Sequence, residues 1–417
     1  MISEMNKITN LQDQASDEEA AKKNRSLRIL MILHMPWNRE LGAPRVSIET
    51  AEELQAMGHA VDKFDINDAF PKRSKVGSFF EMALFPSRAA RFVRQNGHRY
   101  DVIQAEQGNL PYTKGQLNFS GFLIARSNGL AHFYDQYERK SQQKRRMIGQ
   151  KQGSLVGNTL RWFGKRMGGG LTTVERSFDT ADVIILINQD ECDYVSRRLS
   201  HSDKAFLLPN GLSEDRFTQF AAHQTSPDER LESQQVVFIG HWGERKGAAD
   251  FPDLVHAVRQ QAPGTRFLFL GTGKSTASVL GDFKPEDRDS IEIVPFFRSQ
   301  DLPALLSLAT VGTLPSYIEG FGIGVLEQLA SGIPSIAYDV PGPREMLKHF
   351  SQSMLTPVGD VNVMTDRLIA LLHLSLSDYS VLHREALQIA SRFRWRNTAV
   401  RMMEIIIQNR EITRSNE

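Results

Sequence analysis

Residues 311–327 read VGTLPSYIEGFGIGVLE, the stretch from which both the fold and a candidate site can be worked out. The apolar run Val311–Leu314 predicts a short buried strand, and the three glycines that follow Glu319 predict a loop ahead of a helix. If both glutamates lay on one continuous helix, eight residues would turn through about 800° and leave Glu319 and Glu327 about 80° apart. The glycines instead favour Glu319 in the loop and Glu327 in the first turns of the helix.

This loop has the chemistry of a phosphate site. Backbone N–H groups near Phe321 and Gly322 would face a diphosphate, and the two carboxylates would accept hydrogen bonds from sugar hydroxyls. The same sequence is also compatible with a loop without a ligand, in which Glu327 is a solvated helix residue and the glycines only allow the chain to turn. A second loop, GHWGERKG at 240–247, follows another apolar run and adds Arg245 and Lys246 at the same sheet edge, although a solvated basic turn would look alike.

Short apolar runs alternate with helix-length polar stretches along nearly the whole chain. Continuous apolar runs are typical of strands buried on both faces of a parallel sheet. The expected strands are 27–33, 61–64, 101–105, 122–125 and 182–188 in the first half, and 236–240, 267–271, 291–294, 311–314 and 335–338 in the second. The sequence therefore predicts an α/β protein with two doubly wound parallel-sheet domains that face a cleft.

Domain limits are placed where this pattern breaks. We expect a flexible tail over 1–26, a first domain over 27–212, a second over 213–394 and a C-terminal helix over 395–417, whose return to the first domain is left open. The polar stretch 218–235 is interpreted as a linker. Ligands of such sheets bind beyond the carboxyl ends of the strands, so the cleft is the expected site.

Composition excludes several classes of protein. The 417 residues include 50 Lys+Arg and 49 Asp+Glu, a formal net charge of +1, so no nucleic-acid partner is expected. A single cysteine, Cys192, can form neither an intramolecular disulfide nor a thiolate cluster, so no metal or cofactor is expected. Residues 1–26 lack the apolar core of a signal peptide, and runs such as 183–187 fall far short of the roughly 18 residues of a membrane span. These features indicate a cytoplasmic protein.

Together, the motifs resemble a known family. The G-x5-KG loop at 240–247, the E-x7-E element at 319–327, ASGIP at 330–334 and VPGPRE at 340–345 are similar to those of the retaining glycosyltransferases of family 4. That family has the GT-B fold of two Rossmann-like domains. Gly42 and Ala43 resemble its glycine-rich N-terminal loop, GHAV at 58–61 its helix-to-strand turn, and PNG at 209–211 its turn before the second domain. The resemblance covers about residues 27–405.

The resemblance implies a set of site residues. The donor-binding residues would be Gly42, His241, Arg245, Lys246, Glu319, Gly320, Phe321, Gly322 and Glu327, and the catalytic ones Glu319, Lys246 and Asn128. Lys246 would contact the donor diphosphate with Arg245 as a helper, and Gly42 would let its loop approach the phosphates. Glu327 would bind the ribose hydroxyls. Glu319 and the backbone that follows it would hold the donor sugar.

Two positions depart from the family pattern. The family usually has arginine at the position of His241, and histidine is a weaker permanent cation because its ordinary pKa is about 6.5. Asn128 stands where the family has a histidine, and an amide hydrogen-bonds but cannot take a proton. His132, four residues later, is either a substitute or a structural histidine.

Residues 139–166 form a strongly basic segment without an acid. It contains Trp162, Phe163 and nine cations, which are Arg139, Lys140, Lys144, Arg145, Arg146, Lys151, Arg161, Lys165 and Arg166. Cations beside aromatic residues are typical of a contact with an anionic membrane surface. A solvated loop, or a patch for an anionic acceptor, would explain the same composition.

These observations predict a hexosyltransferase of polysaccharide biosynthesis. It would move a sugar from a UDP- or GDP-sugar to a hydroxyl of a glycan or lipid-linked saccharide, without a metal and, as the resemblance implies, with retention of configuration. One alternative is a GT-B nucleotide-sugar epimerase or phosphorylase. Another is a catalytically weak GT-B binding protein, suggested by His241 and Asn128. Membrane binding by 139–166 would make the protein peripheral at the inner face of the cell membrane.

Overall fold

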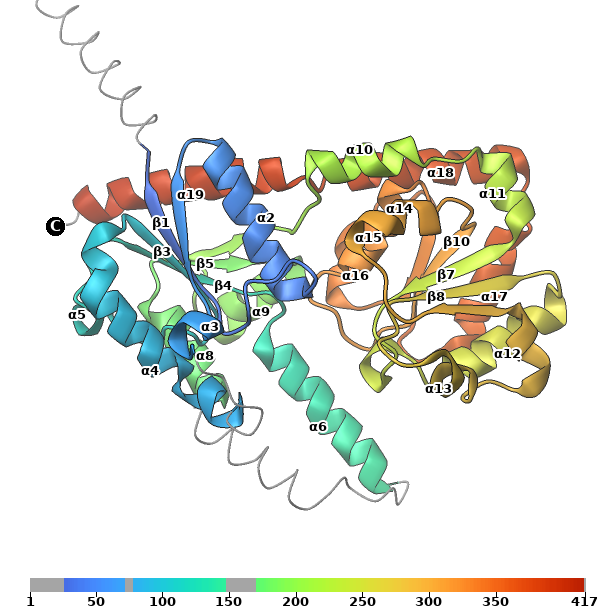
Figure 1. Ribbon diagram of the computed structural model, residues 1–417, viewed down its shortest axis with the longest axis horizontal. Coiled ribbons are helices and arrows are strands. Elements are labelled where there is room, and N and C mark those ends of the chain that lie inside the picture. Colours follow the sequence, from blue (N-terminus) through green and yellow to red (C-terminus); the bar gives the residue numbers. More distant parts are fainter. Residues whose placement is uncertain (1–25, 72–77, 148–169, 416–417) are drawn as a thin grey trace, which may run out of the picture.

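The structure, a computed structural model, describes residues 26–71, 78–147 and 170–415. Within them, two lobes lie side by side, each built on a six-stranded sheet (Figure 1). The strand order is β2-β1-β3-β4-β5-β6 in the first sheet and β12-β11-β10-β7-β8-β9 in the second. All neighbouring strands are parallel. The predicted fold class, two doubly wound parallel sheets, is confirmed.

The strands are short and apolar, as the sequence pattern predicts. Those of the first sheet are β1 (Arg28–Ile32), β2 (Ala60–Phe64), β3 (Val102–Glu106), β4 (Phe122–Arg126), β5 (Val183–Leu186) and β6 (Ala205–Leu207). Those of the second are β7 (Gln235–Ile239), β8 (Arg266–Leu270), β9 (Ile291–Val294), β10 (Val311–Leu314), β11 (Ser335–Tyr338) and β12 (Leu355–Thr356). The central strands β4, β5, β10 and β11 are buried along their whole length.

Helices cover both faces of each sheet. In the first lobe they are α2 (Gly42–Ala56), α3 (Ile66–Ala69), α4 (Ser78–Asn96), α5 (Lys114–Leu117), α6 (Ala131–Met147), α8 (Gly170–Thr180) and α9 (Gln189–Arg198), with the 3-10 turn η1 (Gly97–Arg99). The second has α10 (Glu214–Ala222), α11 (Pro227–Ser233), α12 (Phe251–Gln261), α13 (Thr276–Leu280), α14 (Leu302–Leu305), α15 (Ile323–Ala330), α16 (Pro341–Leu347), α17 (Val361–Leu372) and α18 (Leu376–Ser391). It also has the 3-10 turns η2 (Glu244–Lys246), η3 (Pro285–Ser290) and η4 (Ser299–Asp301). The last described helix is α19 (Trp395–Ser415).

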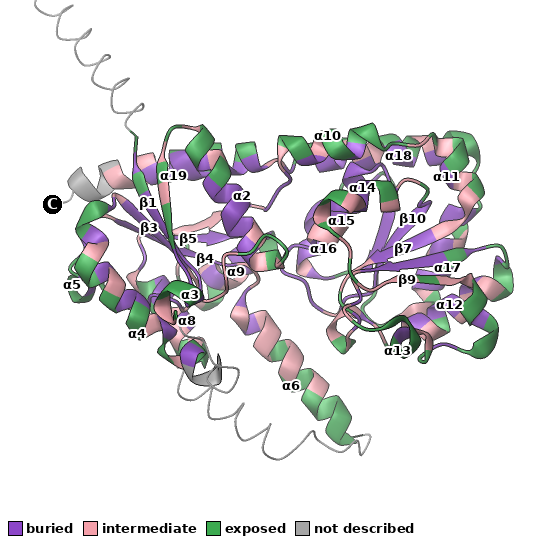
Figure 2. Cartoon of the chain, viewed as in Figure 1, coloured by how far each residue is buried: buried purple, intermediate pink, exposed green. Residues whose placement is uncertain are grey.

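Burial follows these layers. The strands and the inward faces of the helices are buried, whereas the outward helix faces are exposed (Figure 2). In the first lobe, one sheet face packs against α2 and α19, and the other against α3 and α4. The second lobe has one continuous apolar core on both faces of its sheet. Both carboxyl edges are thereby held by rigid layers, which is what a preformed site needs.

The chain crosses between the lobes twice, and the two crossings lie against each other. Leu212, on the outward crossing, donates its N–H to the Phe393 carbonyl over 3.0 Å and accepts from the Trp395 N–H over 3.1 Å. A Cβ on Gly211 would lie only 2.6 Å from the Trp395 nitrogen. After the return crossing, α19 packs against α2, and the Trp395 indole donates to the Glu49 carboxylate.

The interpretation of 218–235 as a linker is wrong. This stretch belongs to α10 and α11, and both helices pack into the second lobe. Ser226 and Glu229 form a capping box with Pro227 at the helix start, the local pattern that begins α11. Arg230 is buried and donates to the carbonyls of Leu306 and Ala309. The polar residues of this stretch therefore cap and anchor helices.

Candidate active site

Arg245, Lys246 and Glu319 meet at the carboxyl edge of the second sheet. Lys246 Nζ lies 2.5 Å and Arg245 Nη1 3.3 Å from Glu319 Oε1. The two cations follow β7 and the carboxylate follows β10, so neighbouring strands bring them together. The Tyr317 N–H also donates to the Arg245 carbonyl over 2.9 Å, which ties the two loops to each other.

The cluster has a net positive charge. Burial raises the pKa of Glu319, but Lys246 and Arg245 lower it, and the net shift is downward. The carboxylate is therefore ionised at neutral pH, and two cations face one anion. Cations held in place beside a cleft stabilise a phosphate and the negative charge that develops on a leaving diphosphate.

Two glycines fix how the loops approach each other. Gly247 has a φ of +76°, and a Cβ there would lie 2.1 Å from the Pro315 carbonyl oxygen. A Cβ on Gly320 would lie 2.9 Å from the Asn128 carbonyl oxygen in the first lobe. The Gly320 carbonyl also accepts a 2.7 Å hydrogen bond from Asn188 Nδ2. The loop that carries Glu319 therefore touches the first lobe directly.

Phe321 and Gly322 lie between this loop and α15. Gly322 is the N-cap of α15 with a φ of +83°, a backbone conformation that favours glycine. Phe321 is buried, and its ring packs edge-on against Phe393 with centroids 5.7 Å apart. The aromatic side chain therefore anchors the loop, and only the backbone around it is left for a ligand.

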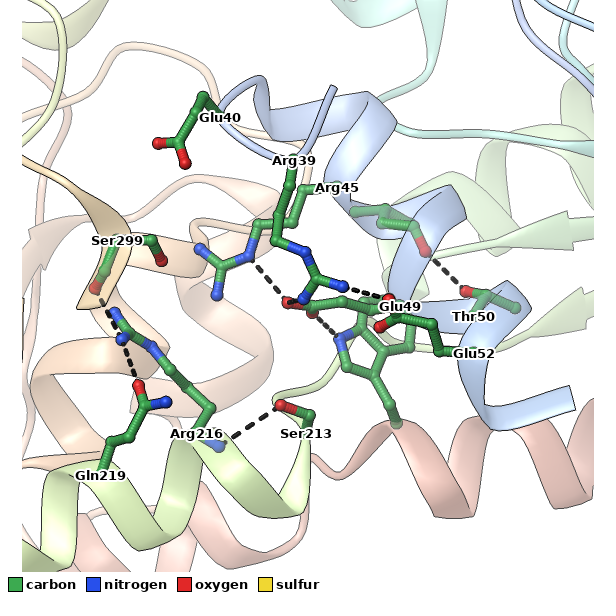
Figure 3. A network of polar contacts seen from close by, with 12 residues as sticks. Arg39, Glu40, Arg45, Glu49, Thr50, Glu52, Ser213, Arg216, Gln219 and Ser299 are labelled. Atoms are coloured by element: carbon green, nitrogen blue, oxygen red, sulfur yellow. Dashed lines mark hydrogen bonds and ion pairs between the residues drawn. The ribbon is translucent and has the colours of Figure 1, made fainter. Parts of the chain in front are cut away.

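Glu327 lies in α15 between two arginines from different parts of the chain. Its Oε1 is 3.0 Å from Arg45 Nη1 in α2 and 3.2 Å from Arg216 Nη2 in α10. Arg45 also donates through Nε to Glu49 over 2.9 Å (Figure 3). Burial lowers the pKa of Arg45, but Glu327 and Glu49 raise it more. Glu327, the residue predicted to bind the ribose hydroxyls, thus also holds the two lobes together.

A cavity of about 690 Å³ opens beside this network. Arg216 Nη1 donates to the Ser299 carbonyl over 2.7 Å and to Gln219 Oε1 over 3.0 Å (Figure 3). Arg298, Ser299 and Arg216 line the cavity together with Arg39, Arg45 and Glu49. Its volume is in the range of small-molecule sites. Because Ser299 follows β9, this cavity lies toward the β8–β9 side of the second sheet.

A second group of polar residues lies in the first lobe, at the ends of β1, β3 and β4. His34 Nδ1 lies 3.1 Å from Glu106 Oε2 and 3.1 Å from Asn109 Oδ1, and Asn128 Nδ2 donates to Glu106 Oε1 over 3.3 Å. Burial lowers the pKa of His34, but Glu106 raises it, with a net upward shift. Burial raises the pKa of Glu106, but His34 lowers it, with a net downward shift. Asn128 Oδ1 is buried without a partner among the described residues, so it is free to bind a ligand.

Tyr134 is a further residue that the sequence did not single out. The Arg245 guanidinium lies 5.8 Å from the centroid of its ring. Burial and the nearby Glu319 carboxylate raise the pKa of Tyr134, and the Gly320 backbone hydrogen-bonds its oxygen. A neutral hydroxyl from the first lobe therefore lies next to the Lys246 cluster. Only the folded structure brings α6 to this loop, so the sequence offers no local signal for Tyr134.

Three other residues singled out in the sequence take no part in the ion pairs of Arg245, Lys246 and Glu319. His241 is exposed, and its ring covers Gly273, whose added Cβ would lie 2.8 Å from the imidazole. His132 is buried, and its Nε2 lies 3.0 Å from Glu175 Oε1. This contact fits the structural histidine of the two alternatives. Gly42 begins α2 with nothing within 4 Å of an added Cβ. The donor contact expected of Gly42 and that expected of His241 stay predictions.

The basic segment is only partly described. Arg139, Lys140, Lys144, Arg145 and Arg146 lie on α6, whereas Lys151, Trp162, Phe163 and the three remaining cations Arg161, Lys165 and Arg166 lie outside the described residues. Within residues 26–71, 78–147 and 170–415, no group of three His, Cys, Asp or Glu side chains is arranged to hold a metal ion. No helix in that part of the chain is long and apolar enough to span a membrane.

Comparison with known sequences shows that residues 233–373 match the family described as glycosyl transferases group 1. A curated relative, the D-inositol 3-phosphate glycosyltransferase of Mycobacteroides abscessus, is 27% identical over 230 residues, which is 53% of this chain and 50% of the relative. The chain thus spans about half the length of the curated relatives it matches.

Comparison with solved structures covers nearly the whole chain. Sucrose-phosphate synthase from Thermosynechococcus elongatus superposes with a TM-score of 0.68 at 19% identity, over 92% of this chain and 99% of that one. Anabaena HepE in complex with UDP-glucose gives a TM-score of 0.60 at 15% identity, over 93% of this chain and 100% of that one. At these identities the likeness establishes the fold.

Proposed function

Because this chain belongs to the glycosyl transferases group 1 family and has the GT-B fold, we propose that it transfers a hexose from a nucleoside diphosphate sugar to a hydroxyl of a glycan or lipid-linked saccharide. The observation that carries the proposal is the cluster of Lys246, Arg245 and Glu319 at the carboxyl edge of the second sheet. Its net positive charge suits the diphosphate of such a donor. The UDP-glucose bound by HepE, a protein of the same fold, is a donor of this class.

The proposed roles follow from the positions of the side chains. Lys246 and Arg245 bind the diphosphate, and the N-terminus of α15 adds its partial positive charge. Glu319 holds the hydroxyls of the donor sugar next to them. Glu327 accepts the ribose hydroxyls beside the 690 Å³ cavity, with Arg45 and Arg216 fixing its carboxylate.

The reaction needs a leaving group, an acceptor and a place for one proton. The bond between the anomeric carbon and the diphosphate oxygen breaks, and the acceptor hydroxyl forms the new bond from the same face. The acceptor's proton passes to the departing phosphate oxygen. Lys246 and Arg245 stabilise the charge on that phosphate, so the step requires no metal.

Two other functions would use the same fold. An epimerase or phosphorylase would bind the same donor but would not glycosylate a hydroxyl acceptor. A catalytically weak binding protein is favoured by one observation, which is that the His241 ring, at the position expected to hold a permanent cation, covers Gly273. Both alternatives predict nucleotide binding without transfer, so they are separated from the main proposal by product analysis.

A thermal-shift screen of nucleotides and nucleotide sugars tests the proposal. A donor at 100 times its dissociation constant should stabilise the protein by about 2.7 kcal/mol. Lys246→Ala should reduce that stabilisation by about 1 kcal/mol or more, whereas Lys284→Ala, at an exposed site, should preserve it. If no nucleotide stabilises the wild type, the proposal fails. Binding without transfer to a broad set of saccharide acceptors would favour the binding protein.

A further inference from the structure

A second cavity, of about 960 Å³, lies between α6 of the first lobe and the second lobe. Helix α6 projects away from the first sheet (Figure 1) and reaches the second lobe through Glu244. Ser141 Oγ donates to Glu244 Oε1 over 2.7 Å, and Arg145 forms an ion pair with the same carboxylate. The helix therefore forms one wall of the cavity, and its basic end is attached to the opposite wall.

The two walls of this cavity have different origins. From α6 come Phe133, Tyr137, Lys140 and Lys144, spaced three or four residues apart and hence on one face of the helix. The opposite wall includes Tyr317, Ile318, Pro341 and Val358, which follow β10, β11 and β12. The rings of Tyr137 and Tyr317 have centroids 6.5 Å apart. Aromatic rings on both walls provide apolar faces against which a sugar ring can pack.

The position of this cavity relative to the donor site follows from the strand order. The 690 Å³ cavity near Arg216 and Ser299 lies toward β9, whereas the 960 Å³ cavity lies toward β11 and β12 at the other end of the same sheet. Lys246 and Glu319, which follow the central strands β7 and β10, lie between them. A donor with its diphosphate at Lys246 and its ribose at Glu327 would leave the 960 Å³ cavity open to the acceptor.

The charges around the cavity favour an anionic group. Arg344 is neutralised by Asp190 over 2.7 Å, and Arg145 by Glu244. In the described part of the chain, Lys140 and Lys144 form no ion pair with a carboxylate. The remaining acid on the cavity wall, Asp250, accepts hydrogen bonds from the hydroxyls of Tyr317 (3.1 Å) and Tyr338 (2.7 Å). Four cations and three carboxylates line the cavity, so the lining carries one net positive charge, and the exposed Lys140 and Lys144 are the cations without an ion-pair partner among the described residues.

From this arrangement we propose that the cavity between α6 and the second lobe binds the acceptor, and that the acceptor carries a phosphate group next to a sugar ring. The inference rests on the proposed transferase function and adds the class of its acceptor. Lys140 and Lys144 bind the phosphate as point charges. Tyr137 and Tyr317 hold the ring and direct its hydroxyl toward Glu319. This proposal assigns the basic end of α6 to the acceptor, whereas binding to an anionic membrane surface is the competing role that the test must separate from it.

A pair of double variants on one helix separates these two roles. Lys140→Gln with Lys144→Gln removes two charges from the cavity wall. Arg139→Gln with Arg146→Gln removes two charges from exposed positions of α6 that do not line the cavity. Both lower the net charge of the helix by two, although Arg139 is ion-paired with Asp135, so an effect that depends only on net charge would respond equally to both.

Binding is measured by titration calorimetry in the presence of a saturating nucleoside diphosphate. The probes are glucose, glucose 6-phosphate as a soluble sugar phosphate, and glucosyl-phosphoryl-polyprenol in detergent micelles as a lipid-linked one. The wild type should bind at least one phosphorylated probe about fivefold more tightly than glucose, the scale of one favourable charge pair. The Lys140/Lys144 variant should lose this preference, and the Arg139/Arg146 variant should keep it. Whichever probe is preferred identifies the source of the phosphate.

Two results would overturn the inference. One is an equal loss in both double variants, which indicates surface electrostatics. The other is the absence of any preference for phosphate in the wild type. Nucleoside diphosphate affinity is measured in the same samples and should be unchanged by either variant. If the wild type does not bind nucleotide at all, the transferase proposal fails, which is distinct from failure of the acceptor assignment.

Discussion

Replacing Glu319 by glutamine should strengthen the binding of a nucleoside diphosphate. In the structure Glu319 neutralises part of the charge on Lys246, whose Nζ lies 2.5 Å from its Oε1. A phosphate within about 4 Å of Nζ would lie about 6 Å from the carboxylate, where one pair of like charges repels by ~2.8 kcal/mol at an effective dielectric constant of 20. Water in the cleft and dissolved salt reduce that repulsion to about 1 kcal/mol. The affinity for UDP or GDP should therefore rise about fivefold.

The same variant should weaken the binding of the intact donor. Glutamine keeps the size of the side chain but binds sugar hydroxyls less strongly than a carboxylate, because charge-assisted hydrogen bonds are the stronger ones. Turnover should fall, although less than in Glu319→Ala, which removes the hydrogen-bonding group altogether. Titration calorimetry with the diphosphate and with the sugar nucleotide measures both effects on one protein sample.

Two controls complete this experiment. Lys246→Ala should move diphosphate affinity in the opposite direction, with a loss of about 1–3 kcal/mol. Glu286→Gln makes the same charge change at an exposed position of η3 and should leave affinity unchanged. Weaker diphosphate binding by Glu319→Gln would refute the reasoning, because it would mean that the carboxylate supports the phosphate site and does not compete with it.

Three further predictions concern stability and chemistry. Glu327→Ala leaves the buried Arg216 and the partly buried Arg45 without their shared carboxylate, while Arg45 keeps Glu49, so the free energy of unfolding should fall by about 3 kcal/mol in chemical denaturation; an unchanged midpoint and slope would contradict this. The upward pKa shift of His34 beside Glu106 contributes stability that is fully present below about pH 6.5 and is lost as the pH rises through the folded-state pKa. As the pH is raised above 6.5, the melting temperature of His34→Gln should therefore fall less than that of the wild type. Parallel plots of melting temperature against pH would be evidence against the ion pair. Transfer should persist in EDTA and give a product with the donor's anomeric configuration by NMR, whereas activity restored to an EDTA-treated enzyme by manganese would contradict the metal-free mechanism.

Much of the fold could be predicted because it depends on local patterns. Short apolar runs with helix-length spacers predict both parallel sheets, and the family and GT-B fold inferred from the motifs are confirmed. The loops of Lys246 and Glu319 could be placed at one edge because both follow predicted strands of the same sheet. The error at 218–235 also has a local cause, since the polar residues of the capping box, Ser226 and Glu229, are also typical of a linker.

The rest of the candidate site depends on contacts that no local pattern encodes. Glu106 meets His34 only because β1 and β3 are neighbours in the sheet, and the strand order cannot be read from the sequence. Arg45 and Arg216 reach Glu327 from helices far away along the chain. Such long-range pairs need the packed structure, whereas the glycines and cations of the loops are visible in the sequence itself.

The paired crossings at Leu212 and Phe393 make the second lobe an insertion into the first. The chain leaves the first lobe, builds the whole second lobe and returns to a point one hydrogen bond from where it left. A unit whose two ends are adjacent can be replaced as a cassette without rerouting its host, as inserted domains generally can. Under the proposed function, donor preference and acceptor preference could be recombined between relatives. Exchanging residues 212–394 would replace the proposed donor half, while the first lobe, completed by α19, would keep its own wall of the proposed acceptor cavity.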